Sequence, residues 1–589
     1  MMDEHALGVQ QSLTGRRWVW RPGDEVRVGQ GIAQALGVPE LMGRLLAARG
    51  VSADDAPGFL EPTLRAMLPD PSCIVDMDVA AARLADAVVG GEIVGVFGDY
   101  DVDGACSAAM MVTLLRQLGC EVVYHVPDRL LEGYGPNANA LRGMAERGAT
   151  LLVCVDCGTG AHAAFAPLHN RADVLVFDHH KAEGPAAQIT ATVNPNRLEC
   201  SSGLHSICAT AVAFIGCVAL LRVLRKRGFF AGRAEPDLRE MLDLVALATI
   251  CDVMPLTGLN RMLVTQGLKV MAKRARPGIA ALLDVAKLTE APTAMNCGFA
   301  LGPRINASGR IAEPDMGLRL LLEEDEGVAA QLAQTLDEVN RQRQAVEAAI
   351  VAEAMARAQA QVEAGHGVIL LAQEGWHPGV VGIVAGRVKE RFNRPALVAG
   401  ITDGLAKGSG RSVPGVDLGA AVIAARQSGL LETGGGHAMA AGFSLPEGAL
   451  GELHAFLNER LGVMELPDVE ALTLDGVLGL GSADAALAQM VARLGPFGTG
   501  NAEPLFVLPR ARVVKSDRIG KDGTTIRAMV ESEGGGRVKA LLFRAKDGPL
   551  AEALGRVGGA PLHLAGYLRA ESWQGRVSAG FFITDAAPA

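Results

Sequence analysis

Three carboxylates stand at alternate positions in a short stretch near residue 100. Residues 94–104 read VGVFGDYDVDG, so Asp99, Asp101 and Asp103 lie close together and a glycine follows them. Like charges this close repel one another, and a folded protein keeps them mainly when a cation neutralises them. In an extended segment, residues spaced by two point to the same side. The stretch therefore predicts a cation site.

The pattern DxDxDG also opens the EF-hand calcium loop. With Asp99 in the first position, the twelfth is Met110, where an EF-hand needs a bidentate glutamate. The apolar run at 93–97 is typical of a buried strand, whereas a helix precedes an EF-hand loop. The three aspartates could also be solvated carboxylates of an ordinary turn, but a turn does not need three of them beside a buried strand. We therefore expect a metal site of another kind.

Other candidate ligands also follow apolar runs. Asp156 comes directly after residues 151–155, and the triplet DHH at 178–180 comes directly after residues 174–177. In an open parallel sheet the carboxyl ends of the strands meet at one edge, which is where sites are built. Asp252 ends another apolar run and is either a ligand or a helix cap. These positions extend the acidic cluster into a larger candidate centre.

The mixture of carboxylates and imidazoles indicates which ions would bind. Such ligands favour Mn²⁺ or Mg²⁺ over Zn²⁺ when thiolates are absent. About six ligands exceed what one small ion takes from a protein, so two ions roughly 3.5–4 Å apart would share them, as in phosphodiester hydrolases.

Three glycine-rich segments carry groups that bind phosphate. We expect residues 302–310 to form a loop that presents two arginines and an asparagine, residues 407–412 to form an anion cradle, and residues 434–437 to form a turn with an imidazole. The candidates are Arg304, Asn306, Arg310, Ser409, Arg411 and His437.

Alternating strand and helix patterns between residues 76 and 180 would position the carboxylates. They predict an α/β domain with a parallel sheet covered on both faces. A long polar helix is expected at 326–364, followed by a smaller α/β unit and an OB-like barrel of five strands. The expected strands of the first sheet are 93–97, 121–126, 151–155 and 174–177, with helices at 105–118 and 137–147. The barrel strands are expected at 505–514, 524–530, 538–543, 562–568 and 575–583.

Composition excludes some classes of protein. The 589 residues include 55 basic and 65 acidic side chains, so the whole surface cannot attract polyanions, although a local basic channel can. The longest apolar run, 207–221, is shorter than the roughly 20 residues that span a bilayer. Cys154 and Cys157 form a CxxC without a second pair. We expect a reduced cytoplasmic protein without a membrane segment.

With these motifs in view, the chain resembles the DHH phosphoesterase superfamily and, within it, the RecJ family of single-stranded-DNA exonucleases. The resemblance covers nearly the whole length. It rests on GDYDVDG at 98–104, VDCGT at 155–159, DHH at 178–180, DVMPL at 252–256, GPRINASGRI at 302–311, EGWHPGVVGIVAGRVKERF at 374–392, SGRS at 409–412, GGGHAMAAGF at 434–443 and LGPFGTGNAEPLF at 494–506.

The resemblance implies stepwise 5′→3′ hydrolysis of single-stranded DNA to 5′-mononucleotides with two Mn²⁺ or Mg²⁺ ions, in DNA repair and recombination. It implies these roles: metal ligands Asp99, Asp101, Asp103, Asp156, His179 and Asp252; orientation of the ligands by Asp178; contact with the scissile phosphate by His180; and substrate binding by Arg129, Arg304, Asn306, Arg310, Ser409, Arg411 and His437. Many relatives have a histidine where this chain has Phe97, so we expect Asp99 to complete the ligands instead.

The resemblance also implies a domain order and partners. We expect a leader at 1–75, a DHH catalytic domain at 76–325, a connecting helix at 326–364, a DHHA1 domain at 365–464 and an OB-fold nucleic-acid-binding domain at 465–589. Expected partners are single-stranded DNA with a 5′ end, single-strand-binding protein and a RecQ-type helicase, and we expect a monomer. The alternatives are another DHH hydrolase, such as a manganese pyrophosphatase, and a DNA-binding scaffold with an inactive site.

Overall fold

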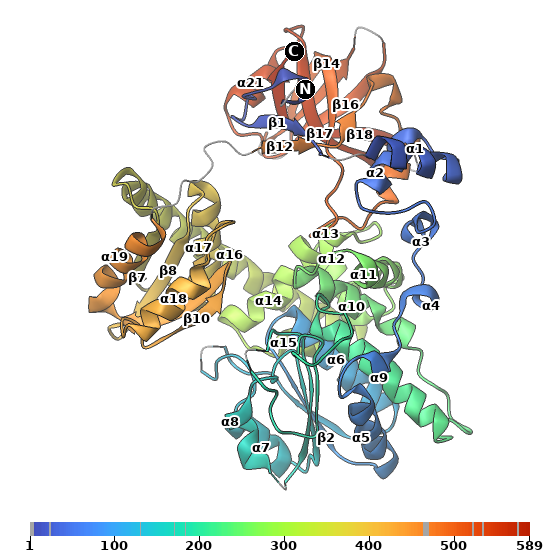
Figure 1. Ribbon diagram of the computed structural model, residues 1–589, viewed down its shortest axis with the longest axis vertical. Coiled ribbons are helices and arrows are strands. Elements are labelled where there is room, and N and C mark those ends of the chain that lie inside the picture. Colours follow the sequence, from blue (N-terminus) through green and yellow to red (C-terminus); the bar gives the residue numbers. More distant parts are fainter. Residues whose placement is uncertain are drawn as a thin grey trace. The chain divides into compact units, whose positions relative to one another are not determined.

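A computed structural model describes residues 5–22, 25–129, 131–169, 171–182, 184–462, 471–520, 523–532, 535–573 and 576–589 (Figure 1). Two compact units make up the chain. The first contains Met1–Pro69, Val253–Leu268 and Pro467–Ala589, and the second contains Asp70–Asp252 and Lys269–Leu466. Among the described residues, no helix is both long enough and apolar enough to cross a membrane.

The second unit contains the predicted parallel sheet, which has a fifth strand, β6, beyond the four that the sequence predicts. The strands run in the order β3-β2-β4-β5-β6, so the chain first adds β3 on one side of β2 and then adds β4 on the other. The carboxyl ends of β2 and β4 therefore lie at the point where the strand order reverses, which is where open α/β sheets bind ligands. The strands are β2 (Val94–Gly98), β3 (Val122–His125), β4 (Leu151–Val155), β5 (Asp173–Phe177) and β6 (Ala191–Val193).

Helices cover both faces of this sheet. On one face lie α7 (Ala138–Glu146) and α8 (His162–Phe165), and on the other lie α5 (Met77–Gly90), α6 (Val102–Gln117) and α9 (Ala209–Lys226) (Figure 1). The buried side chains of α7, Leu141 and Met144, pack against the sheet in one apolar core. The sheet is thus rigid, and its carboxyl edge is free to carry polar groups.

Helix α6 begins earlier than the predicted residue 105. Asp101 is its N-cap, and the Asp101 side chain accepts a hydrogen bond from the backbone N–H of Gly104. A Cβ atom at Gly104 would lie 2.3 Å from the backbone oxygen of Asp99, so glycine allows the first turn to pack against the strand end. The prediction of an extended segment through Asp103 is wrong, because aspartate at an N-cap starts a helix.

Residues 302–310 form a helix, α14, and not the predicted loop. The helix continues from a π-helical turn and has Pro303 in its first turn, where proline is compatible with a helix. Its Gly309 packs against the backbone of Tyr100, because a Cβ atom there would lie 2.8 Å from the Tyr100 oxygen. The helices of this region are α10 (Leu242–Cys251), α11 (Gly258–Met271), α12 (Pro277–Val285), α13 (Ala294–Asn296), the π-helix (Cys297–Leu301), α14 (Gly302–Ile311) and α15 (Met316–Leu322).

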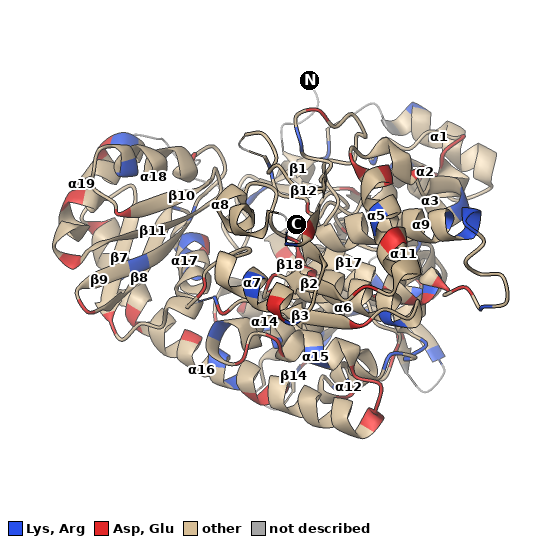
Figure 2. Ribbon diagram, turned by 90° about the horizontal axis from the view of Figure 1, so that it is seen from below, with Lys and Arg blue, Asp and Glu red and all other residues tan. Residues whose placement is uncertain are grey.

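The predicted long helix is α16 (Glu326–Glu363). Asp325 caps its N-terminus, and acidic and basic residues alternate along it (Figure 2). Ion pairs four residues apart, such as Asp337 with Arg341 and Arg343 with Glu347, support a helix of this kind.

The smaller α/β part of this unit has a five-stranded mixed sheet in the order β10-β11-β9-β8-β7. The glycine-rich segments predicted as a cradle and a turn are strands β9 and β10. Glycine is needed there for close packing, since a Cβ atom at Gly408 would lie 2.3 Å from the Phe443 ring. The elements are β7 (Ile369–Glu374), α17 (Pro378–Phe392), β8 (Ala396–Thr402), β9 (Leu405–Arg411), α18 (Leu418–Gln427), β10 (Thr433–His437), β11 (Ala440–Pro446) and α19 (Leu450–Leu461).

The first unit contains the predicted five-stranded barrel. Its strands follow the order β14-β15-β16-β18-β17, and pairing of β17 with β14 closes the barrel. This is an OB-type arrangement, with α21 inserted between the third and fourth strands. The strands are β14 (Phe506–Ile519), β15 (Thr525–Glu531), β16 (Arg537–Leu542), β17 (Leu562–Trp573) and β18 (Arg576–Pro588), with β13 (Gly476–Val477), α20 (Ala485–Ala492) and α21 (Pro549–Gly555) beside them.

The N-terminal residues fold with this barrel. Strand β1 (Arg17–Trp20) pairs in parallel with β12 (Ala471–Leu474), and the buried indole N–H of Trp18 donates to Asp585 at 2.9 Å. Apolar side chains of the next helices, including Leu45 and Leu46, join the barrel core. Sequence periodicity does not reveal this packing, since it joins the two ends of the chain. The remaining helices are α1 (Glu25–Leu36), α2 (Glu40–Ala47), α3 (Ala56–Leu60) and α4 (Leu64–Met67).

Candidate metal centre

The six predicted ligands converge at the carboxyl edge of the parallel sheet. Asp99 follows β2, Asp156 follows β4, His179 follows β5, and Asp252 is the C-cap of α10. Together with His180, their ligand atoms form three groups, within each of which the atoms lie no more than 4.8 Å apart. The groups are Asp99, Asp101 and Asp156; Asp103, His179 and Asp252; and Asp156, His179 and His180.

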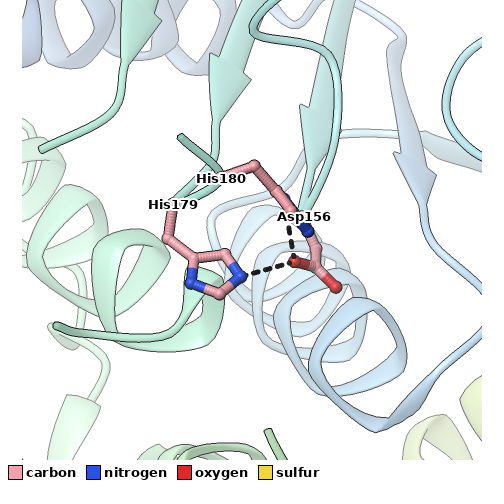
Figure 3. Close-up of side chains that lie close together, drawn as sticks. All are labelled: Asp156, His179 and His180. Atoms are coloured by element: carbon pink, nitrogen blue, oxygen red, sulfur yellow. Dashed lines mark ion pairs between the residues drawn. The ribbon is translucent and has the colours of Figure 1, made fainter. Parts of the chain in front are cut away.

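Asp156 and His179 lie at the centre of the cluster. Nε2 of His179 lies 3.3 Å from Oδ1 of Asp156, and the close-up shows both imidazoles paired with this carboxylate (Figure 3). The same Nε2 atom lies 3.6 Å from Asp252 and 3.7 Å from Asp103. One imidazole therefore faces three carboxylates.

Several carboxylate oxygens of the cluster are buried without partners. Among the described residues, Oδ1 of Asp99, Oδ1 of Asp156 and Oδ2 of Asp252 have no hydrogen bond. Burial, and then repulsion from the neighbouring carboxylates, raises the pKa of Asp99, Asp101 and Asp156, and raises the pKa of Asp252 to about 8. Several buried carboxylates that share so few donors are costly, and a divalent cation removes that cost. The residues present therefore fit a metal site.

The donor atoms are oxygen and nitrogen. Burial raises the pKa of the nearby thiols Cys157 and Cys251, which disfavours the thiolates that a zinc site would use. Carboxylates with one or two imidazoles are ligands for Mn²⁺ or Mg²⁺.

A left-handed backbone conformation occurs at or directly after two of the candidate ligands. Asp156 has φ of +60°, and Val253, directly after Asp252, has φ of +59°. This left-handed conformation is unfavourable for an aspartate and more so for a β-branched valine, and it persists only where the surrounding structure imposes it. Both turns redirect the chain immediately beside a candidate ligand.

Asp103 is fixed by a second helix. Its carboxylate accepts hydrogen bonds from the backbone N–H groups of Ala209 and Thr210, at the N-terminus of α9, and from the Thr210 hydroxyl. The carboxylate thus lies at the positive end of the dipole of that helix. Asp103 therefore reaches the cluster from the first turn of α6, held in place by α9.

Asp178 lies in none of the three groups. Its carboxylate accepts from Nδ1 of His180 at 2.8 Å and from the Thr159 hydroxyl at 2.6 Å. The pKa of Asp178 is lowered overall. Burial raises it, but the hydrogen bond from His180, the charge of His180 and the hydrogen bond from Thr159 lower it by more. Burial alone would lower the pKa of His180, but Asp178 raises it to about 9.

Sequence reasoning missed two polar residues at this site. The hydroxyl of Tyr134 donates to the backbone oxygen of Asp156 at 3.1 Å and lies 3.0 Å from Nδ1 of His180. Thr159 donates to Asp178, as described above. Thr159 ends the motif VDCGT, whereas Tyr134 lies in none of the motifs quoted above.

Three of the predicted substrate-binding arginines repel one another. Burial, then Arg129, Arg343 and Arg411, lower the pKa of Arg310 to about 10, and burial and Arg129 lower the pKa of Arg411. No described carboxylate forms an ion pair with Arg129, Arg310 or Arg411. Guanidinium groups gathered without a counter-ion form a binding site for an anion.

The other predicted substrate-binding residues differ from these arginines in their partners. Arg411 donates to Oγ of Ser409 at 3.3 Å, two positions earlier on β9. Arg304 pairs with Asp337 at 2.7 Å and so already has a partner. Asn306 is half-buried and His437 is exposed. In the described part of the chain, neither forms a hydrogen bond or an ion pair with the candidate metal ligands.

Known families and proteins resemble the chain. The DHH family, N-terminal domain, matches residues 93–249; the DHHA1 domain matches 365–462; and the RecJ OB domain matches 474–585. The single-stranded-DNA-specific exonuclease RecJ of Dickeya dadantii is 38% identical over 514 residues, which cover 85% of this chain and 88% of that protein.

Two solved structures share the fold. Thermus thermophilus RecJ in complex with Mn²⁺ has a TM-score of 0.79 and 28% identity, covering 97% of this chain and 78% of that one. The same protein in complex with Mg²⁺ has a TM-score of 0.74, 28% identity and coverage of 97% and 77%. The predicted fold class is confirmed, and the acidic and histidine residues cluster as a metal site. The chain belongs to the RecJ family.

Proposed function

We propose that this protein is a metal-dependent 5′→3′ exonuclease that hydrolyses single-stranded DNA to 5′-mononucleotides and acts in DNA repair and recombination. Its relatives are named single-stranded-DNA-specific exonucleases. The observation that carries the proposal is the set of buried carboxylate oxygens on Asp99, Asp156 and Asp252 that have no hydrogen bond among the described residues and share one neighbouring imidazole pair at the sheet edge.

Two of the ligand groups suit a pair of ions. Asp99, Asp101 and Asp156 would hold one ion, and Asp103, His179 and Asp252 the other; this choice gives Asp99 the role of a ligand. Bound Mn²⁺ or Mg²⁺ supplies an activated water and offsets charge on the phosphate in the transition state. Asp156 and His179, which also share the third group, keep the two sets of ligands adjacent.

His180 is suited to contact the scissile phosphate. Its pKa of about 9 keeps the imidazole protonated at neutral pH, and Asp178 fixes its orientation. The side chain remains 44% exposed, unlike that of His179, which is 11% exposed. A cationic donor that is both oriented and accessible stabilises a phosphate oxygen.

The arginine cluster would bind the 5′ end. Arg129, Arg310 and Arg411 lack carboxylate partners among the described residues, and Ser409 adds a hydroxyl. A terminal phosphate carries more negative charge than an internal one, so a site of this kind would select the end of a strand. We propose that it sets the 5′→3′ polarity.

The barrel would bind the strand farther from its end. Phe506 is buried and Phe497 is partly buried in the core, whereas Phe543 is 56% exposed. Phe543 stacks with Phe582 at 5.7 Å, and the Arg569 guanidinium lies 4.9 Å from the Phe582 ring. An exposed ring, Phe543, stacked on a half-buried ring beside a guanidinium provides a stacking surface for unpaired bases. Tyr567 is half-buried beside them, and the Trp573 side chain lies outside the described residues.

The test is digestion of end-labelled single-stranded DNA with Mn²⁺. We expect mononucleotides to be released from the 5′ end, with a blunt duplex and a 5′-blocked strand resisting digestion. Equal digestion from both ends, or digestion of the blunt duplex, would contradict the proposal. Interaction with single-strand-binding protein or a RecQ-type helicase, and the monomeric state, remain predictions that pull-down and sedimentation experiments can test.

A further inference from the structure

Two asparagines after strand β6 hold the turn that carries the histidine pair. Asn194 is fully buried, and its Nδ2 donates to the backbone oxygen of His180 at 2.8 Å. Nδ2 of Asn196 donates to the backbone oxygen of His179. The backbone carbonyls of the two histidines are thus each bound by the side-chain amide of a different asparagine.

A second route connects Asn194 to the His180 ring. The ionised carboxylate of Asp178 can only accept hydrogen bonds, so the Thr159 hydroxyl must donate to it. The Thr159 oxygen then accepts from Asn194 at 2.8 Å. Asp178 in turn accepts from Nδ1 of His180. Asn194 therefore fixes both the backbone and, through two intermediates, the ring of His180.

Asn194 joins the ends of three strands. Thr159 follows β4, His180 follows β5, and Asn194 itself follows β6. Its remaining acceptor, Oδ1, is occupied by the backbone N–H of Asn196 at 2.7 Å. Asn194 thus bridges segments that directly follow Asp156 and His179 at the ends of β4 and β5.

We propose that Asn194 and Asn196 are positioning residues that form an amide clamp, and that this clamp sets the affinity of the centre for Mn²⁺. The inference rests on the proposed metal-dependent function. Groups that orient metal ligands without touching the ion commonly contribute 10- to 100-fold to metal affinity or activity. The clamp acts through the ligands and contacts neither the ion nor the substrate.

The decisive variant is Asn194→Asp, which keeps the shape and removes both donors. The new carboxylate would face the two oxygens that Asn194 now binds. Electrostatic attraction alone predicts tighter Mn²⁺ binding from an added negative charge, whereas loss of the clamp predicts binding weaker by about 10- to 100-fold. The measurement is titration of the metal-free full chain with Mn²⁺ alone. We expect Asn196→Ala, at a half-buried position, to weaken binding in the same direction.

Asn501→Asp is a matched control. Asn501 is also buried, and its Nδ2 donates to the backbone oxygens of Leu494 and Pro496 at 2.9 Å each, within the other compact unit. We expect this variant to lower the melting temperature and leave Mn²⁺ affinity unchanged. Unchanged or tighter Mn²⁺ binding by Asn194→Asp would overturn the proposal; if that variant does not fold, unchanged binding by Asn196→Ala would do so.

Activity provides a second readout. Cleavage by Asn194→Asp should recover as the Mn²⁺ concentration is raised, whereas a general loss of structure would not respond to metal. The proposed function is tested separately. A wild-type protein that binds Mn²⁺ but leaves single-stranded DNA intact would refute the nuclease and not the clamp. An active enzyme whose two asparagine variants bind Mn²⁺ normally would refute the clamp alone.

Discussion

Nε2 of His179 lies 3.3 Å from Oδ1 of Asp156, a buried oxygen without a hydrogen-bond partner among the described residues. The two atoms come from adjacent parallel strands, and the register of β4 with β5 places them side by side. Direct pairing leaves further carboxylates of the cluster uncompensated, which fits a cation at this centre.

Asp156→Asn should remove the response to metal. The change keeps the size of the side chain and removes the carboxylate shared by two ligand groups. We expect cleavage to fall by more than about 100-fold, since even residues that only orient ligands contribute 10- to 100-fold. Single-stranded DNA binding should persist, because the arginine cluster is unchanged. The checks are cleavage rate, DNA affinity and the Mn²⁺-induced rise in Tm, with Asp237→Asn at an exposed ion pair as control. A normal Mn²⁺-induced rise in Tm would contradict the assignment.

The metal-free protein should become less stable as the pH rises. Burial and the neighbouring carboxylates raise the pKa of Asp252 to about 8 from an ordinary value of 3.8, and the pKa of Asp156 is raised as well. The folded state therefore holds protons that the unfolded chain releases near pH 4. The stability that these protons provide is complete below about pH 4 and is lost as the pH rises to 8 and beyond.

Mn²⁺ should reverse this trend, because it binds the ionised carboxylates. Melting curves at several pH values, with and without Mn²⁺, should show a metal-induced gain in Tm that grows between about pH 6 and pH 8. In the metal-free protein the His180 ring adds to the loss of stability, because its pKa is raised from 6.5 to about 9 and its contribution is therefore lost between about pH 6.5 and pH 9. A metal-free Tm that stays constant or increases across this interval would contradict the prediction.

Arg411→Ala should weaken the preference for a 5′-phosphate. Its guanidinium lies beside Ser409 in a cluster that has no carboxylate partner in the described part of the chain, so its loss removes a charge-assisted contact worth about 1.5–3 kcal/mol. The measurement is the ratio of cleavage rates on phosphorylated and unphosphorylated 5′ ends. Arg391→Ala, an exposed arginine on α17, is the matched control and should leave the ratio unchanged. The same ratio in Arg411→Ala and the wild type would exclude this residue from end recognition.

The sequence allowed the centre to be predicted because polar residues follow buried strands. Asp156 and His179 stand directly after runs whose apolar character is unmistakable, and a parallel sheet must bring such positions together. Local geometry was less predictable. Asp101 caps a helix that begins three residues before the predicted start, and Gly309 belongs to a helix because its missing Cβ permits contact with Tyr100.

Contacts between distant segments could not be read from the chain. Trp18 and its hydrogen-bond partner Asp585 are 567 positions apart in the sequence, and no periodicity predicts such a pair. Asn194 was overlooked for a similar reason: its role depends on Thr159 and His180, which only the sheet brings close. Glycine-rich segments were misread as turns, because glycine serves both turns and closely packed strands.

Phe543→Ala should reduce affinity for long single-stranded DNA more than for short strands. The ring is 56% exposed and stacked on Phe582, so its removal leaves the barrel core intact. Loss of one base-stacking contact costs about 1–3 kcal/mol. Binding of oligonucleotides too short to span both the arginine cluster and the barrel should be unaffected. The measurement is fluorescence anisotropy across a series of strand lengths, with Val557→Ala at an exposed apolar position as control. Equal loss at every length, or no loss at any, would contradict this prediction, since a contact that only long strands reach must depend on length.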